Sequence, residues 1–147
     1  MAIIKNKKSK YPSVITWLVG APLIWLMIIP VLFSDILLEI YHRIAFPLYG
    51  IKQVKRSNYI RIDRHKLSYL TWYEKIACMY CGYVNGWLHY ASVVAGRTES
   101  FFCPIEHLEG RGYVQTEHEK SFAKYGDEAS LRKRYSEAEE TEKKNNK

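Results

Sequence analysis

The chain has 147 residues, of which 48% are hydrophobic and 25% are charged, and its formal net charge is +7. This length allows one small domain with appendages but not two full domains. Three cysteines are too few for a disulfide-rich secreted scaffold, and the sequence has no collagen-like or low-complexity repeat. Apolar residues gather near the N-terminus and polar residues fill the C-terminal end, which also excludes an evenly mixed soluble globule.

Composition divides the chain into five predicted segments. They are a basic flank at 1–12, a membrane anchor with an interfacial helix at 13–50, a basic membrane-facing connector at 51–66, a Cys/His module at 67–110 and a charged tail at 111–147. The predicted fold class is mainly α, with an N-terminal membrane helix or helical hairpin, an interfacial amphipathic helix, a small α-rich metal-knuckle module and a charged tail that is helical or disordered.

An uncharged run of 24 residues, from Tyr11 to Ser34, predicts a retained membrane anchor. About 20 apolar residues in a helix cover the roughly 30 Å hydrocarbon layer of a bilayer. A cleaved signal peptide is the alternative, because lysines precede the run. The run is longer than the 7–15 apolar residues, roughly, of a signal-peptide core, and no small-residue cleavage pattern follows it.

The prolines Pro22 and Pro30 each remove a backbone hydrogen bond from a helix in this run. The next stretch, 31–50, has helical spacing and is apolar except for one narrow stripe. That stripe consists of Asp35, Glu39, His42 and Arg43. We expect this helix to lie in the membrane interface or against the first segment. Basic residues flank both ends of the anchor, so the positive-inside rule leaves a single pass and a re-entrant hairpin open.

Glu39 and His42 have the i, i+3 spacing of half a carboxylate-bridged di-iron site, but the chain lacks a second such pair. The favoured interpretation is an ion pair between Glu39 and Arg43, one helical turn apart. A third hypothesis gives Asp35, Glu39 and His42 catalytic roles in a lipid-handling enzyme at the interface.

The connector at 51–66 carries six basic residues and one acidic residue. Directly after a membrane element, such a patch suits anionic lipid headgroups, at about 1 kcal/mol for each basic residue near the surface. The predicted headgroup ligands are Lys52, Lys55, Arg56, Arg61, Arg64 and Lys66. No nucleic-acid-binding motif accompanies them, so the predicted partner is the membrane and not nucleic acid. Alternation over 59–63 also allows a short strand.

The Cys/His module contains Cys78-x-x-Cys81 followed by Gly82, which is typical of a metal-binding turn that needs a glycine with positive φ. Cys103 and His107, four residues apart, could complete a tetrahedral Cys3His site for zinc, or for iron as the alternative. Between these halves, apolar residues recur with helical spacing and predict an amphipathic helix that Gly96 ends or loosens. These residues are Val84, Trp87, Leu88, Ala91, Val94 and Ala95.

The run from Cys78 to Tyr83, followed by Cys103-Pro104, resembles the paired knuckles of rubredoxin-like and zinc-ribbon proteins. The resemblance covers 78–107 and implies metal coordination, not electron transfer. This chain differs from those families in lacking a fourth thiolate and in having a predicted helix where they use strands. The anchor followed by Tyr-Cys-Gly-Tyr is also similar to small bacterial membrane proteins of unassigned function. This implies a bacterial inner membrane, with the Cys/His module on the cytoplasmic face.

Other uses of the cysteines stay open. Cys78 and Cys81 could form a redox dithiol, although no thioredoxin-like pattern surrounds them. In a further alternative, all three cysteines are plain core residues. His89 could replace His107 as a ligand, whereas His118 lies in a charged stretch and is interpreted as solvated.

In the tail, Asp127 is a predicted N-cap for a solvated helix that runs to about Glu142. Taken together, these features predict a membrane-anchored accessory or assembly protein of a larger membrane complex, with a structural zinc site. A closed four-ligand site leaves no position for a substrate, so we lean against an enzyme. The alternative is a membrane-bound redox protein or electron carrier that uses iron or the dithiol.

Overall fold

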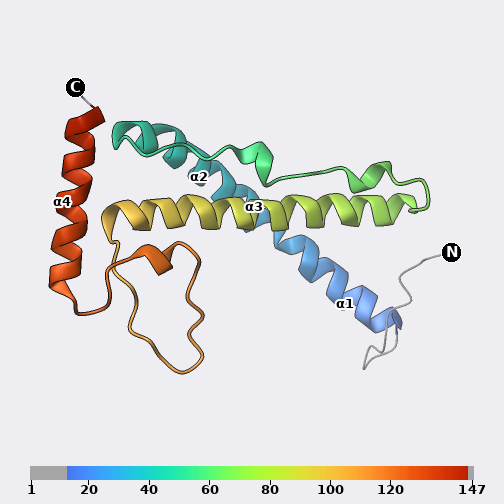
Figure 1. Cartoon of the computed structure of the whole chain (residues 1–147). Helices are drawn as coiled ribbons and strands as arrows, with labels where there is room; N and C mark the ends of the chain where they lie inside the picture. The colour runs from blue at the N-terminus through green and yellow to red at the C-terminus, as the bar shows by residue number, and fades with distance from the viewer. Residues whose placement is uncertain (1–12, 146–147) are drawn as a thin grey trace. The chain divides into compact units, whose positions relative to one another are not determined.

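The computed structural model describes residues 13–145 and shows a mainly helical protein, as predicted (Figure 1). The α-helices are α1 (Ser13–Leu26), α2 (Ile28–Leu48), α3 (Trp72–Phe102) and α4 (Glu128–Asn145). Single 3-10 turns lie between them: η1 (Arg56–Asn58), η2 (Arg64–Lys66) and η3 (Glu119–Ser121). The predicted basic flank at 1–12 lies outside the described residues.

The chain separates into two compact units, Met1–Ser92 and Val93–Lys147, and the boundary between them falls inside α3. The first unit contains α1, α2, the connector and the longer, N-terminal part of α3. The second contains the end of α3, a long loop with η3, and α4.

The helices α1 and α2 follow each other end to end, with only Met27 between them (Figure 1). Pro30 has no N–H to donate to the Leu26 carbonyl, and the backbone tightens instead, with the Met27 N–H 3.3 Å from the Ile24 carbonyl. Pro22 lies inside α1 without ending it. The two helices therefore form one long apolar element and do not fold back on each other as a hairpin.

The end of α2 is a Schellman motif, which turns the chain back towards α3. The Ile51 N–H donates to the Phe46 carbonyl at 2.8 Å, and the Gly50 N–H to the Pro47 carbonyl at 3.2 Å. Gly50 has φ of +68°, in the left-handed region that side chains with a Cβ rarely occupy.

The connector then runs back along α3 (Figure 1), and two helical glycines make this close approach possible. A Cβ on Gly82 would lie 2.8 Å from the Arg61 carbonyl oxygen, and one on Gly86 would lie 2.7 Å from that of Tyr59. The predicted turn after Cys81 is therefore wrong, because α3 continues through Gly82, which is not among the glycines with positive φ. Residues 59–63, where the alternation also allowed a short strand, form no strand, because this stretch packs against a helix.

The helix predicted between Cys81 and Cys103 is confirmed, but α3 extends well beyond it in both directions. Its buried face includes Trp87, Tyr90 and Val94, whereas Leu88, which we expected on the apolar face, is half exposed. Gly96 does not end the helix. A Cβ at Gly96 would lie 2.8 Å from the His118 ring, so this glycine makes room for an imidazole.

The tail forms the predicted helix, α4. The Asp127 carboxylate accepts a hydrogen bond from the Ser130 N–H at 3.0 Å, which confirms the predicted N-cap. An ion pair of 2.6 Å between Arg132 and Glu128, one turn apart, stabilises the first turns of this solvated helix.

Candidate functional site

The four predicted metal ligands are divided between the two units of the structure. Cys78 is half-buried and Cys81 is exposed, and both lie inside α3 in the first unit. Cys103, exposed, and His107 follow the end of α3 in the second unit. The spacing of two residues between Cys78 and Cys81 fits a metal-binding turn and a helix equally well. The sequence alone therefore did not distinguish the two structures. The Cys3His zinc site stays a prediction without support from these contacts.

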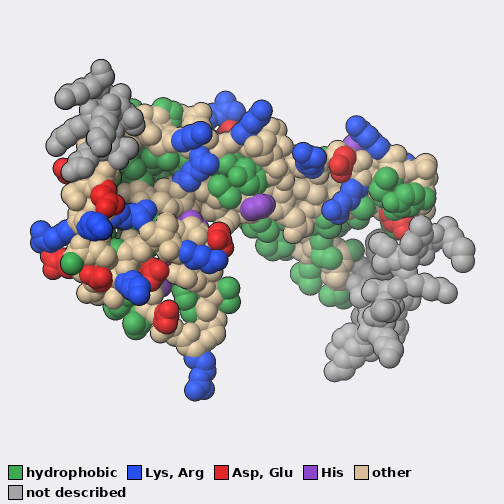
Figure 2. All heavy atoms as spheres, in the orientation of Figure 1, with side chains coloured by type: hydrophobic (Ala, Val, Ile, Leu, Met, Phe, Trp, Pro, Cys, Tyr) green, Lys and Arg blue, Asp and Glu red, His purple; other side chains and the backbone are tan. Residues whose placement is uncertain are grey.

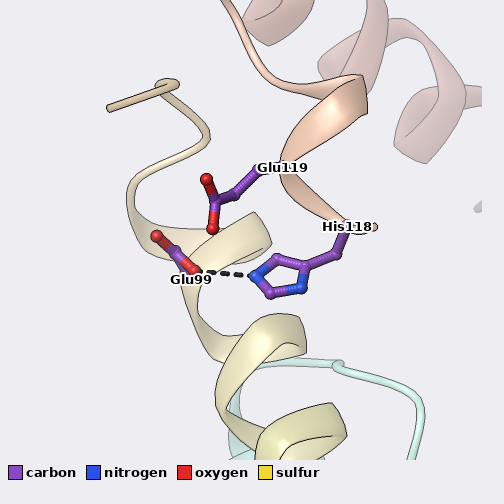
Figure 3. Close-up of side chains that lie close together, drawn as sticks. All are labelled: Glu99, His118 and Glu119. Carbon is purple, nitrogen blue, oxygen red and sulfur yellow. Dashed lines mark hydrogen bonds and ion pairs between the residues drawn. The ribbon is translucent and has the colours of Figure 1, made fainter. Parts of the chain in front are cut away.

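Another group of side chains does come together in the second unit (Figure 3). Among the described residues, Glu99, His118 and Glu119 have potential ligand atoms that all lie within 4.8 Å of one another. Glu99 comes from the last turns of α3, and the other two come from the start of η3. The His118 Nε2 atom lies 2.8 Å from a carboxylate oxygen of Glu99. His118 is therefore not a solvated residue as interpreted from the sequence.

Neighbouring side chains hold these groups in place. Glu119 is only 4% exposed and accepts hydrogen bonds of 2.5 Å from the hydroxyls of Thr116 and Tyr113. These bonds keep the pKa of Glu119 below its ordinary value, and the bond to Glu119 raises the pKa of Tyr113 to about 12. His107 approaches the other carboxylate oxygen of Glu99, with 3.7 Å between its Nε2 atom and Oε1.

A second polar cluster lies in the first unit, on the narrow stripe of α2. Arg56 donates to both carboxylate oxygens of Asp35, Nη2 to Oδ2 at 2.6 Å, and the Tyr83 hydroxyl donates to the same carboxylate at 2.6 Å. Hydrogen bonding to Asp35 raises the pKa of Arg56 above its ordinary value, so the guanidinium stays charged. Asp35 is buried, and its charge is compensated within the cluster.

The same cluster fixes the state of His42, which is 4% exposed. Its Nε2 atom accepts a hydrogen bond from the Val54 N–H at 2.9 Å, so this nitrogen carries no proton. Its Nδ1 atom lies 3.1 Å from the Tyr90 hydroxyl, which is also 3.1 Å from Glu39. The consistent arrangement is a neutral ring in which Nδ1–H donates to Tyr90, and Tyr90 donates to Glu39.

The ion pair predicted between Glu39 and Arg43 is confirmed, with 2.8 Å between the Arg43 Nε atom and Glu39. Glu39 also lies 3.6 Å from Arg56, which thus faces both carboxylates of the stripe. Sequence reasoning found the local partner of Glu39 but missed the partners that the connector and α3 contribute.

The basic connector presents most of its charge to the surface. Figure 2 shows Lys and Arg side chains along the edge of the first unit that the connector forms. The exposed members are Lys52, Lys55, Arg61, Arg64 and Lys66. Arg56 is the exception among the predicted headgroup ligands, since it is only partly exposed and pairs with Asp35.

The apolar helix of the first unit is largely exposed. Leu18–Leu48 is long and apolar enough to cross a membrane, and only 11% of its most apolar part is buried. Large side chains point outward along its whole length, among them Leu18 at 70%, Ile29 at 64% and Phe33 at 64% exposure.

In comparisons with known proteins, no family model, no curated protein and no solved structure matches this chain. What the protein does is therefore inferred from its own residues and their contacts.

Proposed function

We propose that this protein is a membrane-anchored accessory protein whose apolar helix, Leu18–Leu48, lies in the bilayer. The observation that carries the proposal is the exposure of this helix. The core helix of a soluble protein buries its apolar side chains, whereas only 11% of the most apolar part of this one is buried. Removing such a surface from water is strongly favourable, at about 25 cal/mol for each Å².

The polar stripe of α2 is compatible with this placement. The 31 residues of the apolar helix exceed what a layer of roughly 30 Å requires. The helical stretch 13–34, about 33 Å long at 1.5 Å per residue, covers the hydrocarbon, and the stripe that begins at Asp35 lies near the headgroups. Ionisable residues at such a depth pair with one another, as Asp35 does with Arg56 and Glu39 with Arg43.

An accessory role fits the chemistry of the stripe better than catalysis does. Asp35 accepts hydrogen bonds from Arg56 and Tyr83, and Glu39 accepts them from Arg43 and Tyr90. Groups that satisfy each other in this way stabilise the packing of α3 and the connector on α2. In our proposal the exposed basic connector binds anionic headgroups beside the anchor, and the protein serves a larger membrane complex.

Membrane fractionation of the full-length protein tests the anchor. We expect the protein to stay in the membrane pellet after an alkaline carbonate wash and to keep its N-terminal run, as judged by intact mass. Leu23→Lys with Ile29→Lys should release it, because each lysine near the centre of a spanning helix costs about 3 kcal/mol.

The matched control places lysines at two exposed apolar positions outside the helix, Leu108→Lys with Val114→Lys. This variant should stay in the pellet. Release of the wild-type protein by the wash would contradict the proposal, and so would an intact mass showing that the run had been cleaved off as a signal sequence.

A further inference from the structure

We propose that Glu99, His118 and Glu119 bind one divalent transition-metal ion, with zinc as the best fit. This site goes beyond the membrane proposal and uses other residues. One imidazole nitrogen and two carboxylates, with ligand atoms within 4.8 Å of one another, form a set of the type that zinc accepts. Bound zinc would join the end of α3 to the loop that carries η3.

The charge of the group favours a cation. The carboxylates of Glu99 and Glu119 lie close together, and Glu119 is 4% exposed. Two like charges at this separation repel each other, and burial of one of them weakens the screening by water. The imidazoles of His118 and His107 lie 2.8 and 3.7 Å from the carboxylate oxygens of Glu99. A divalent ion bound among these groups would offset the repulsion between the carboxylates.

The surroundings resemble the outer shell of a metal site. Thr116 and Tyr113 each donate a hydrogen bond to Glu119, which fixes the orientation of its carboxylate. Such hydrogen bonds to a ligating carboxylate orient it towards the metal and strengthen binding. Gly96 gives the His118 ring its place on α3, since a Cβ there would lie 2.8 Å from the ring nitrogen Nδ1.

A fourth ligand is available beside the three. His107 Nε2 lies 3.7 Å from Glu99, and the side chain is 62% exposed, so its ring can move towards the ion. When zinc binds, the hydrogen bond between His118 Nε2 and Glu99 is replaced: the Nε2 lone pair coordinates the ion, and the neutral ring carries its single proton on Nδ1. His107 was predicted as a ligand from the sequence, but with the cysteines as its companions.

Calorimetric titration of zinc into the purified full-length protein tests the site. We expect one zinc per chain, and at least about tenfold weaker binding in His118→Gln and in Glu119→Gln. The matched control is Glu117→Gln, because Glu117 is adjacent in sequence, is 87% exposed and pairs only with Lys120 among the contacts described. Absence of zinc binding, or an equal loss in the control, would overturn the proposal.

Cobalt substitution separates this site from the predicted cysteine site. Cobalt bound to nitrogen and oxygen ligands should show no thiolate charge-transfer band, and a protein with Cys78, Cys81 and Cys103 all changed to Ser should bind it as the wild type does. A thiolate band that disappears in the cysteine variant and persists in His118→Gln would overturn the proposal.

Two more conservative substitutions test the site with less risk that the variant protein fails to fold. Tyr113→Phe and Thr116→Val keep the size of each side chain but remove a hydrogen bond to Glu119, and each should weaken zinc binding about tenfold. Unchanged affinity in both would count against the site. Membrane fractionation does not depend on these residues, so failure of the metal proposal leaves the anchor proposal standing.

Discussion

At the scale of single residues, Tyr90 combines full burial with a hydroxyl that contacts two polar side chains. It is fully buried, and its hydroxyl joins Glu39 of the α2 stripe to the neutral ring of His42. Burial and the negative charge of Glu39 raise the pKa of this hydroxyl to about 12. The residue thus contributes both apolar packing and one of the hydrogen bonds that α3 supplies to the stripe.

We expect Tyr90→Phe to destabilise the protein by about 1–3 kcal/mol, because it leaves Glu39 and His42 each short of one partner. Unfolding by denaturant in detergent micelles measures this change. The matched control is Tyr69→Phe, which removes a hydroxyl from a side chain that is 62% exposed and should change stability by less than about 0.5 kcal/mol. Equal effects of the two substitutions would refute the role given to Tyr90.

The same hydroxyl predicts a dependence on alkaline pH. Above the ordinary tyrosine pKa of 10.0 the unfolded chain loses a proton that folded Tyr90 keeps up to a pH of about 12. The stability that this hydroxyl contributes is therefore complete below pH 10 and is lost as the pH rises towards 12. Tyr90→Phe should lose less stability than the wild type over this range, and parallel stability curves would contradict this.

At the scale of elements, α3 depends on glycines that would weaken an isolated helix. Gly82 and Gly86 lie one turn apart and let the backbone of the connector contact the helix directly. Each glycine costs about 1 kcal/mol relative to alanine in a helix interior. The connector offsets this cost by packing Tyr59 against His89 and Tyr90, with ring centroids 4.9 and 6.1 Å apart.

Gly86→Ala should therefore destabilise the protein even though alanine favours the helix. The new Cβ would lie 2.7 Å from the Tyr59 carbonyl oxygen and 2.9 Å from the Ile60 Cα atom, so the connector must move. We expect a net loss of about 1–3 kcal/mol, measured by thermal unfolding in detergent. Gly20→Ala is the control, because nothing lies within 4 Å of a Cβ at that helical position. A stabilised Gly86→Ala protein would show that the contact is unimportant.

At the scale of the whole molecule, exposed apolar residues and basic residues occupy different segments of the chain. A continuous row of exposed apolar side chains lies along α1 and α2, and the basic connector follows these helices directly in the chain. The formal charge of +7 is thus not spread evenly. A protein with this pattern should enrich anionic lipid around itself.

Reconstitution of the full-length protein into mixed vesicles tests this expectation. Energy transfer from its tryptophans to a labelled anionic lipid, relative to a labelled zwitterionic lipid, measures the enrichment. Changing Lys55, Arg61 and Arg64 to Gln should reduce it several-fold, since each basic residue near the surface contributes about 1 kcal/mol. The matched control changes three basic residues of the tail to Gln: Lys124, Arg132 and Lys133. Equal enrichment in wild type and connector variant would contradict the role of the connector.

Some features could be predicted because their causes lie within a few residues of one another. The apolar run, the pair of Glu39 with Arg43 and the cap at Asp127 all depend on local spacing. Helical periodicity and uncharged length are likewise properties of a continuous stretch of chain. Local sequence patterns therefore suffice to predict the helical fold class, the long apolar helix and the solvated C-terminal helix.

Which distant side chains meet depends on how the elements pack, and local sequence patterns do not reveal it. Asp35 and Arg56 are 21 residues apart, and Glu99 and His118 are 19 apart, so no local pattern pairs them. Gly82 is equally ambiguous, because a glycine after Cys-x-x-Cys suits a metal-binding turn as well as a helix that another segment approaches closely. The packing of the connector resolves this ambiguity in favour of the helix. Its backbone contacts α3 at Gly82 and Gly86, where there is no room for a Cβ atom.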